Sequence, residues 1–268
     1  MSCTIVVPCY NETKRLDRAE FMNYLAKHPA VSFVFVDDGS TDGTGALLDE
    51  FQTELPDQIK VVHQQPNQGK AEAVRTGMLH ALSNQKAGQI GFWDADLATP
   101  LDAIDDLLKV FQDHPDVEIV FGARVKLLGR KIERQATRHY LGRVFATCAS
   151  IVLGLPVYDT QCGAKLFRVT PVFSQVLQQP FCSRWIFDVE LIARFLQEYS
   201  AQGRNAQSLF YEFPLYCWRD IAGSKVRATD FAKAARELFL IRNQYHFKRP
   251  KDSVAVHTGW AAEQSKRN

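Results

Sequence analysis

The sequence predicts an α/β fold in which a mostly parallel sheet is flanked by helices. Short apolar runs alternate with longer stretches that carry helix signals through the first half of the chain, which is the pattern of strands separated by helices. Such strands pair in parallel through crossover helices that cover both faces of the sheet. Polar clusters follow the apolar runs, where open α/β sheets bind their ligands. At 268 residues, the chain suits one large domain or two small ones.

The first half contains five predicted strands with helices between them. The strands are expected at residues 4–8, 32–36, 59–63, 89–93 and 117–121. Helices are expected at 18–27, after 41–42, and from 70 to about 82. Thr41 or Asp42 is suited to cap the helix after the second strand, because both side chains accept hydrogen bonds from helical amides. Pro100 stands where a first helical turn would begin.

The second half has a different character. Residues 131–155 are expected to form one long helix whose first part is basic and whose later part, 144–153, is nearly uncharged. A loop and a strand are expected in 158–168, and helices in 187–198 and 229–245. The predicted organisation is a main domain at 1–225, a C-terminal helix at 226–248 and a polar, flexible tail at 249–268.

Composition excludes some classes of protein. The formal net charge of +2 is too small to make nucleic acid the main partner. The six cysteines show neither CxxC nor Cys/His zinc spacing, and Cys3, Cys9 and Cys148 are expected to be small buried hydrophobes in a reducing compartment. The chain starts without a basic leader and has no apolar stretch of bilayer length, so a cytoplasmic location is expected, with attachment to a membrane surface left open.

Asp94-Ala95-Asp96 closes the apolar run 89–93. In an extended segment, residues two apart point to the same face, so the two carboxylates can meet one hard cation. A diphosphate could complete the shell of that cation. The pattern is common in loops, and the other polar clusters decide its meaning. They are expected at the same edge of the sheet, at 10–12, 37–38, 67–70 and 122–124.

Four motifs, in this order along the chain, resemble those of family 2 glycosyltransferases, which have the Rossmann-like GT-A fold. They are Pro8-Cys9-Tyr10-Asn11-Glu12, Asp37-Asp38-Gly39-Ser40-Thr41-Asp42, Asn67-Gln68-Gly69-Lys70 and Asp94-Ala95-Asp96. Three later motifs are similar to those of dolichyl-phosphate β-glucosyltransferases, at 159–167, 184–191 and 223–226. The resemblance implies that a hexose, glucose from UDP-glucose, moves onto a polyprenyl phosphate by metal-assisted single displacement, with inversion at the anomeric carbon.

The resemblance implies a nucleotide pocket around the first two motifs. It assigns Asp38 the role of accepting a hydrogen bond from the uracil N–H. Tyr10 offers a ring face, and Pro8 and Glu12 flank the same pocket. The alternative is ordinary turn chemistry, in which aspartates only cap the turn and the helix that follows. We favour nucleotide binding for Asp38 and capping for Asp42.

The donor diphosphate is expected to lie near the third and fourth motifs. Lys70 follows a glycine at a helix start, where amides and an ammonium suit an anion, although a solvated surface lysine is the alternative. Asp96 is the best candidate metal ligand, and Asp94 either shares the metal or holds the ribose. Oxygen ligands suit Mg²⁺ or Mn²⁺, which would act as a Lewis acid on the leaving diphosphate. Related mannose synthases place a metal-binding Gln where this chain has Ala98, which favours the glucosyltransferase-like group.

An acceptor phosphate needs cations, and its candidates are Arg124, Arg138 and, more weakly, Lys225. Arg124 and Arg138 match positions that related synthases use for phosphate, and arginine binds phosphate oxygens in a bidentate way. A solvated helix face is the alternative for Arg138. Asp159 is the family-like candidate for positioning or deprotonating the acceptor. Cys162 is expected to be a packing residue, because single displacement needs no nucleophile from the protein.

Residues 131–155 have two interpretations, a peripheral helix lying in the lipid headgroup region and an ordinary core helix; we favour the first. Three other functions are weighed against the main one. The same donor chemistry could serve a glycan or soluble acceptor. A nucleotidyltransferase is disfavoured because 8–12 is not a Gly-rich phosphate loop. A non-catalytic sugar-nucleotide-binding protein is disfavoured by the intact Asp94–Asp96 pair together with Arg124 and Asp159. The sequence leaves the sugar, the polyprenol and the oligomeric state open.

Overall fold

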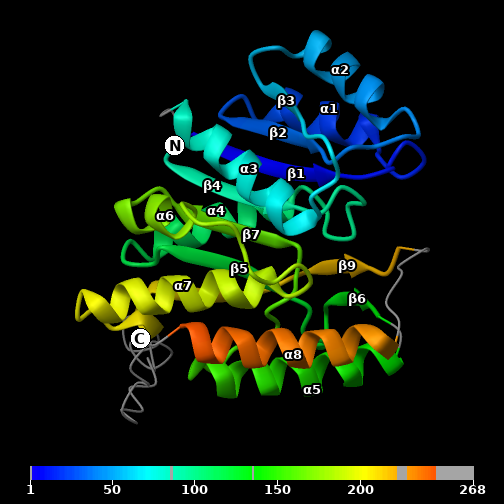
Figure 1. The fold of residues 1–268 in the computed structure, drawn as a ribbon. Coiled ribbons are helices and arrows are strands. Elements are labelled where there is room, and N and C mark those ends of the chain that lie inside the picture. Colours follow the sequence, from blue (N-terminus) through cyan, green and yellow to red (C-terminus); the bar gives the residue numbers. More distant parts are fainter. Residues whose placement is uncertain (1, 85–86, 135, 222–227, 246–268) are drawn as a thin grey trace.

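The computed structural model describes residues 2–84, 87–134, 136–221 and 228–245, with side chains omitted at 136–138 and 228–232. Its centre is a seven-stranded sheet in the order β3-β2-β1-β4-β7-β5-β8 (Figure 1). These strands are β1 (Cys3–Cys9), β2 (Val31–Asp37), β3 (Ile59–His63), β4 (Gln89–Trp93), β5 (Ile119–Ala123), β7 (Ala164–Arg168) and β8 (Phe210–Pro214). A second sheet contains β6 (Lys131–Glu133) and β9 (Cys217–Arg219).

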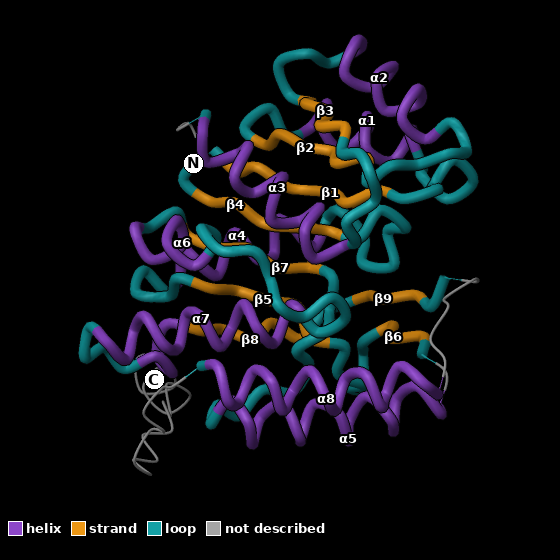
Figure 2. The backbone as a smooth tube through the Cα atoms, in the orientation of Figure 1, coloured by secondary structure: helices purple, strands orange, loops and turns teal. Residues whose placement is uncertain are grey.

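The helices cover both faces of the large sheet, and the loops that join them to the strands are marked in teal in Figure 2. They are α1 (Arg18–Lys27), α2 (Thr44–Glu54), α3 (Lys70–Ser83), α4 (Ala103–Asp113), α5 (Ala136–Leu153), α6 (Pro171–Val176), α7 (Phe187–Ala201) and α8 (Ala228–Gln244), with a 3-10 turn at Ala206–Leu209. The α/β prediction is therefore confirmed, and each of the five predicted strands is present within two residues of its expected bounds.

The sheet is parallel except at one strand. β1 pairs in parallel with β2 and β4, as do β2 with β3 and β5 with β8. β7 is inserted between β4 and β5 and runs antiparallel to both. This strand follows the 158–163 loop, so the inserted strand brings that loop back to the edge where β4 ends. The chain thereby adds a second-half loop to the site formed by the first half.

Alternating side chains in the central strands supply two separate cores. Ile5, Val7 and Phe33 belong to the apolar cluster that contains buried residues of α1, α2 and α4. Val6 and Val34 point the other way and belong to the cluster built from α3, α7 and α8. A sheet buried on both faces requires nearly continuous apolar strands, which explains why the first-half strands are uninterrupted hydrophobic runs.

Long-range pairing corrects the prediction of one helix over 131–155. Lys131–Glu133 forms β6 by pairing in parallel with Cys217–Arg219, and the helix begins only at Ala136. The partner strand is more than 80 positions away in the sequence, so no local pattern could announce it. Cys148 is also exposed, contrary to expectation, whereas Cys3 and Cys9 are buried as predicted; all six cysteines are free.

Two predicted helix starts also differ in detail. The N-cap of α2 is Gly43, without a side-chain cap of its own, in place of Thr41 or Asp42. The Asp42 carboxylate nevertheless accepts from the amide of Thr44, at 3.1 Å. The helix α4 starts at Ala103, three residues after Pro100, whose carbonyl accepts from the Ala103 amide in the preceding turn.

Candidate active site

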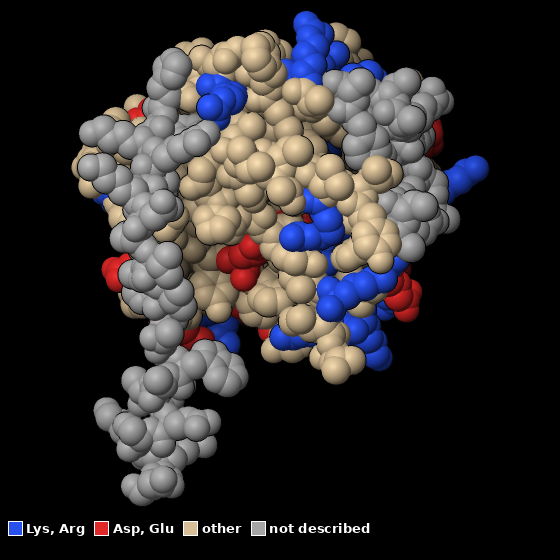
Figure 3. All heavy atoms as spheres, turned by 90° about the horizontal axis from the view of Figure 1, so that it is seen from below, with Lys and Arg blue, Asp and Glu red and all other residues tan. Residues whose placement is uncertain are grey.

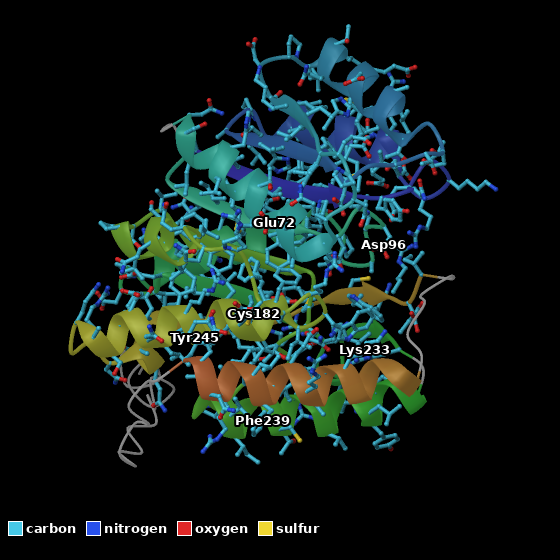
Figure 4. The ribbon with its side chains drawn as sticks, viewed as in Figure 1. Glu72, Asp96, Cys182, Lys233, Phe239 and Tyr245 are labelled. Atoms are coloured by element: carbon cyan, nitrogen blue, oxygen red, sulfur yellow. The ribbon has the colours of Figure 1, made fainter. Side chains whose placement is uncertain are left out.

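The Asp94-Ala95-Asp96 segment leaves β4 as a tight turn at the edge of the sheet, where Figure 4 labels Asp96. Leu97 takes a left-handed conformation with φ of 51°, and its amide donates to the Asp94 carbonyl at 3.2 Å. The Asp96 carboxylate accepts from the Ala98 amide at 3.1 Å. This contact fixes one oxygen of Asp96 within its own turn and leaves the second free of protein donors among the described residues.

Three loops meet at Asp94. The Lys70 ammonium forms an ion pair with its carboxylate, and the Asp94 amide donates to the Gly163 carbonyl at 3.0 Å. A Cβ atom on Gly163 would lie only 2.0 Å from an Asp94 carboxylate oxygen, so this close approach requires glycine. The prediction that residues 67–70 and Asp94 share an edge is confirmed, and the 159–163 loop joins them.

The charges at this edge are only partly compensated. Burial, reinforced by the negative charge of Asp94, raises the pKa of the Asp96 carboxyl. Desolvation disfavours the charge on Lys70, but Asp94 and Asp188 outweigh it and hold the pKa of the lysine above its ordinary value. Ionised Asp96 therefore needs a further cation nearby, and two carboxylates of this kind fit a hard divalent ion.

Asp38 anchors the loop that carries Lys70. Its two carboxylate oxygens accept from the amides of Gln68 and Gly69, both at 2.8 Å, while Asn67 donates to the Asp38 carbonyl at 2.7 Å. Burial raises the pKa of Asp38 against these hydrogen bonds. This anchoring role was not recognised in the sequence, where Asp38 was assigned to the uracil; that contact stays a prediction.

The remaining residues of the predicted nucleotide pocket lie beside this loop. The Tyr10 side chain is 46% exposed, which leaves its ring available for stacking, and Pro8 is half-buried. Glu12 pairs with Arg15 through one oxygen, while its other oxygen is buried without a hydrogen-bond partner in the described structure. Burial raises the pKa of Glu12, and the charge of Asp96 adds to this.

Arg124 and Asp159, predicted for separate roles, form one buried pair. The Arg124 Nε donates to Asp159 Oδ2 at 2.6 Å and Nη2 donates to Oδ1 at 2.8 Å. The Arg124 amide adds a third bond at 3.1 Å. Although burial opposes ionisation, the Arg124 charge holds the pKa of Asp159 well below its usual range. So acidic a carboxyl is a weak base, and the geometry favours positioning over deprotonation.

Side chains from β8 and α5 hold the loop that carries Asp159, and the sequence did not predict these contacts. Glu212 of β8 accepts from the amides of Asp159 and Tyr158, at 2.6 and 2.8 Å. Arg143 of α5 donates to the Tyr158 carbonyl at 2.7 Å and stacks over its ring. The only local signal was a lone glutamate in the apolar strand 210–214.

The sequence also makes predictions for Cys162, Arg138 and Lys225, and Lys165 belongs to the 159–167 motif. Lys165 shapes the 159–163 loop, since its buried ammonium donates to the Cys162 carbonyl and to Asp188, both at 2.6 Å. Burial raises the pKa of the Cys162 thiol to about 11, which fits a packing role. Arg138 falls in α5 with its side chain outside the described residues, and Lys225 lies outside them altogether.

The described residues contain no group of three or more His, Cys, Asp or Glu side chains arranged to hold a metal ion. A metal here would therefore depend on Asp94 and Asp96 together with ligands from a substrate. Hard oxygen donors and the raised pKa of Asp96 fit Mg²⁺ or Mn²⁺ held partly by a diphosphate.

A sheet of this topology, with an Asp-x-Asp turn beyond β4, defines a GT-A glycosyltransferase. The profile of Glycosyl transferase family 2 matches residues 4–173, and the chain belongs to this family. Dolichyl-phosphate β-glucosyltransferase ALG5C of Trichomonas vaginalis is 32% identical over 89% of this chain and 70% of its own length. The human dolichyl-phosphate β-glucosyltransferase is 31% identical, with 90% and 75% covered. The resemblance and enzyme class predicted from the motifs are thus confirmed.

Solved structures share the fold at lower identity. Mannosyltransferase PcManGT from Pyrobaculum calidifontis, in complex with GDP-Man and Mn²⁺, has a TM-score of 0.58 at 19% identity, covering 90% of this chain and 62% of that one. Glucosyl-3-phosphoglycerate synthase from Mycobacterium tuberculosis, in complex with Mn²⁺ and UDP-glucose, has a TM-score of 0.60 at 16% identity. It covers 90% of this chain and 77% of its own. The GT-A fold prediction is confirmed.

Proposed function

We propose that this chain transfers glucose from UDP-glucose to a polyprenyl phosphate, with inversion at the anomeric carbon. One observation carries the proposal: relatives named dolichyl-phosphate β-glucosyltransferase match about nine tenths of the chain. The similarity therefore includes α7 and β8 as well as the 4–173 segment common to the family. The division into a main domain at 1–225, a helix at 226–248 and a tail at 249–268 belongs to the same proposal; the tail lies outside the described residues.

On the donor side, Lys70 and the Asp94–Asp96 pair would hold the UDP diphosphate together with Mg²⁺ or Mn²⁺. When bound, the cation supplies a Lewis acid that stabilises the leaving diphosphate. Asp96 would be the main ligand, since Lys70 already pairs with Asp94. Tyr10 and Asp38 would bind the base, and Pro8 and Glu12 would flank it.

On the acceptor side, a phosphate oxygen of the polyprenyl phosphate would attack the anomeric carbon. The new C–O bond forms as the bond to UDP breaks, and UDP leaves with the bonding electron pair. A phosphate monoester is largely ionised near neutral pH, so the reaction needs little help from a base. Arg124, whose Nε and Nη2 are held by Asp159, would position the acceptor phosphate through its remaining guanidinium N–H groups.

A lipid acceptor also requires a route to the membrane surface. No helix among the described residues is long and apolar enough to span a bilayer. One face of α5 is core, with Ala149 and Leu153 fully buried, while Tyr140 and Val144 on its other face are 70% and 65% exposed. The buried face is that of a core helix, and the exposed apolar face is what supports our proposal of a helix in the headgroup region.

Further exposed apolar side chains lie near this face of α5. α5 and α8 contact each other and lie side by side at the bottom of Figure 1. The view from below in Figure 3 shows a largely uncharged face with groups of Lys and Arg and smaller groups of Asp and Glu. On these two helices the further exposed apolar residues are Leu141, Ile151, Phe239 and Leu240. We propose that this side contacts the lipid headgroup region, as basic amphipathic helices do.

The transfer reaction is tested with a panel of UDP- and GDP-sugars, a short polyprenyl phosphate and Mn²⁺ or Mg²⁺. Labelled glucose that enters the organic phase from UDP-glucose supports the proposal. Product that stays aqueous and requires a soluble acceptor supports the alternative of a glycan or soluble acceptor. Release of pyrophosphate supports a nucleotidyltransferase, and no turnover with any donor supports a binding protein.

Attachment to membranes is tested by flotation with liposomes that contain anionic lipid. Protein that floats with anionic vesicles and less with neutral ones supports the lipid-facing surface, because polybasic attraction depends on anionic headgroups. Protein that stays at the bottom of the gradient with both vesicles contradicts it.

A further inference from the structure

The loop before Lys70 is held from two sides by charged side chains. The Gln68 amide donates to Asp38 Oδ1 at 2.8 Å, and the Gln68 carbonyl accepts from Arg184 Nη2 at 3.2 Å. Arg184 comes from the turn just before α7, 116 positions along the chain. The backbone N–H and C=O of Gln68 are thus both hydrogen-bonded, which fixes the path of the chain that leads to Lys70.

Arg184 lies directly beside this loop as well as being bonded to it. Its Nε atom is 3.9 Å from the position that a Cβ on Gly69 would take. Its positive charge also lowers the pKa of Asp38, in opposition to the dominant effect of burial. Arg184 is exposed, so its contact with the loop is a surface interaction and contributes nothing to the apolar core.

The backbone of the Arg184 turn is held in turn by α8. Glu237 Oε1 accepts from the Arg184 amide at 3.4 Å, and Oε2 accepts from the Trp185 and Ile186 amides at 3.2 and 3.1 Å. Ile186 is the N-cap of α7 and supplies no side-chain cap. Glu237 therefore provides, from another helix, the negative charge and acceptor atoms that a helix N-terminus needs.

These contacts form a continuous connection from α8 to the diphosphate side of the site. Glu237 holds the Arg184 turn, and Arg184 holds Gln68. Two residues later, Lys70 reaches Asp94. Figure 4 labels Lys233 and Phe239 of α8 and, farther from that helix, Asp96. Apart from the two covalent backbone steps from Gln68 to Lys70, each step is a hydrogen bond or an ion pair between described residues.

We propose that Arg184 is a positioning residue for the sugar-nucleotide donor, and that Glu237 acts through it. Arg184 holds the 67–70 loop in the conformation that presents Lys70 to the diphosphate. Without Arg184 the loop is held from one side only, by Asp38, and pays an ordering cost when the donor binds. This inference rests on the proposed function, in that it takes the 67–70 loop to bind a nucleoside diphosphate.

The test measures binding of UDP, and in parallel GDP, by calorimetry with Mn²⁺ and without any acceptor. Arg184→Met is expected to weaken binding about tenfold, the scale of one hydrogen bond from a charged donor. Arg184→Lys keeps the charge but loses the fork and should weaken binding by less. In transfer assays the donor KM should rise for Arg184→Met, while kcat and the acceptor KM change less than about twofold.

Glu237→Gln provides the second arm, because an amide keeps one acceptor oxygen and loses the charge. It is expected to weaken UDP binding about threefold. The double variant should bind no more weakly than Arg184→Met alone, since both changes act on the same connection. Matched controls are Arg242→Met and Glu50→Gln, which alter exposed residues and should leave UDP binding unchanged.

Three results would overturn the inference. One is wild-type UDP affinity in a folded Arg184→Met protein. Another is an effect of Arg184→Met no larger than that of Arg242→Met. The third is full additivity of Arg184→Met and Glu237→Gln, which indicates independent structural roles. If Arg184→Met does not fold, Arg184→Lys and Glu237→Gln carry the test. Failure of the acceptor assignment is separate, because UDP binding is read without acceptor.

Discussion

The carboxyl pKa values are shifted in opposite directions on the two sides of the site. On the proposed donor side, burial raises the pKa values of Asp96, Glu12 and Asp38. On the acceptor side, Arg124 lowers the pKa of Asp159 below its usual range. The carboxylates of the proposed donor side therefore carry negative charge that the protein only partly neutralises. On the proposed acceptor side, the charge of Asp159 is already neutralised by Arg124.

This difference indicates which side of the site needs a bound ligand to balance its charges. We expect the charges of the Asp94–Asp96 turn to be balanced only when a cation and a diphosphate bind, so that part of the interaction free energy is gained on binding. The Arg124–Asp159 pair is complete within the protein and contributes to the fold as well as to the site. We expect changes on the donor side to reduce activity and changes on the acceptor side to reduce both activity and stability.

The largest expected effect is that of Asp96→Asn. Loss of the main metal ligand should reduce transfer about a thousandfold, the scale of Lewis-acid stabilisation of a leaving diphosphate. Stability to urea should not fall, because the ionised carboxylate is disfavoured by burial and Asn carries no charge. Turnover assays and urea unfolding check the two statements. Near-normal turnover would contradict the metal assignment. A large loss of stability would contradict the expectation that changes on the donor side reduce activity alone.

Arg124→Met tests the opposite side. Removing one partner of a buried ion pair leaves an uncompensated charge and costs about 3–5 kcal/mol of unfolding free energy. Activity should fall as well, because the acceptor phosphate loses the guanidinium group proposed to position it. The matched control is Arg18→Met in the exposed pair with Glu54, whose side chains are 51% and 46% exposed, where we expect less than about 1 kcal/mol. Equal losses in the two variants would contradict the assigned burial effect.

Asp159→Asn sharpens the comparison through pH. The folded-state pKa of Asp159 is lowered, so ionised Asp159 stabilises the fold above the unfolded pKa, about 3.9. That contribution is lost as pH falls from this value toward the folded pKa. The difference in unfolding free energy between wild type and Asp159→Asn should therefore be constant from about pH 7 to 5 and shrink below about pH 4. A difference that grows on acidification would reverse the assigned sign.

The smallest effects are expected at the proposed lipid-facing surface. Val144→Ser removes apolar area worth about 1 kcal/mol from a 65% exposed position, so binding to anionic liposomes should weaken about fivefold. Transfer to a water-soluble short-chain acceptor should be unaffected. Ala26→Ser, at an exposed position of α1, is the control. Equal flotation of Val144→Ser and wild type would place membrane contact elsewhere.

Much of this site was predictable because its donor half is made of local motifs. Each predicted strand of the first half is an apolar run, such as 89–93, and a polar cluster follows it closely in the sequence. Asp94 and Lys70 could therefore be placed at one edge of the sheet before any contact was known. The parallel topology guarantees that such clusters converge. The sequence predicts which residues belong to the site but not which protein groups they contact. Asp38 is predicted to bind a ligand, whereas in the structure its carboxylate accepts hydrogen bonds from two amides of the 67–70 loop.

The acceptor half was harder, because its contacts join distant segments. Arg124 and Asp159 are 35 positions apart, and each alone reads as a free charge. Only the antiparallel insertion of β7 brings their loops together. The wrong helix start at 131 has the same cause, since β6 exists only through its pairing with β9. Cys148 was misplaced because an uncharged helix can still turn one face to solvent.

The sequence by itself determined the order of strands and helices in the first half, the parallel half-sheet, the family and the Asp94–Asp96 turn, because apolar periodicity and motif spacing are properties of neighbouring residues. Only the tertiary structure decided that Arg124 pairs with Asp159, that Gly163 packs against Asp94, and that Glu237 and Arg184 connect α8 to the Lys70 loop. These contacts depend on burial and on pairing across the fold, which set the charge of each group and cannot be read from its neighbours along the chain.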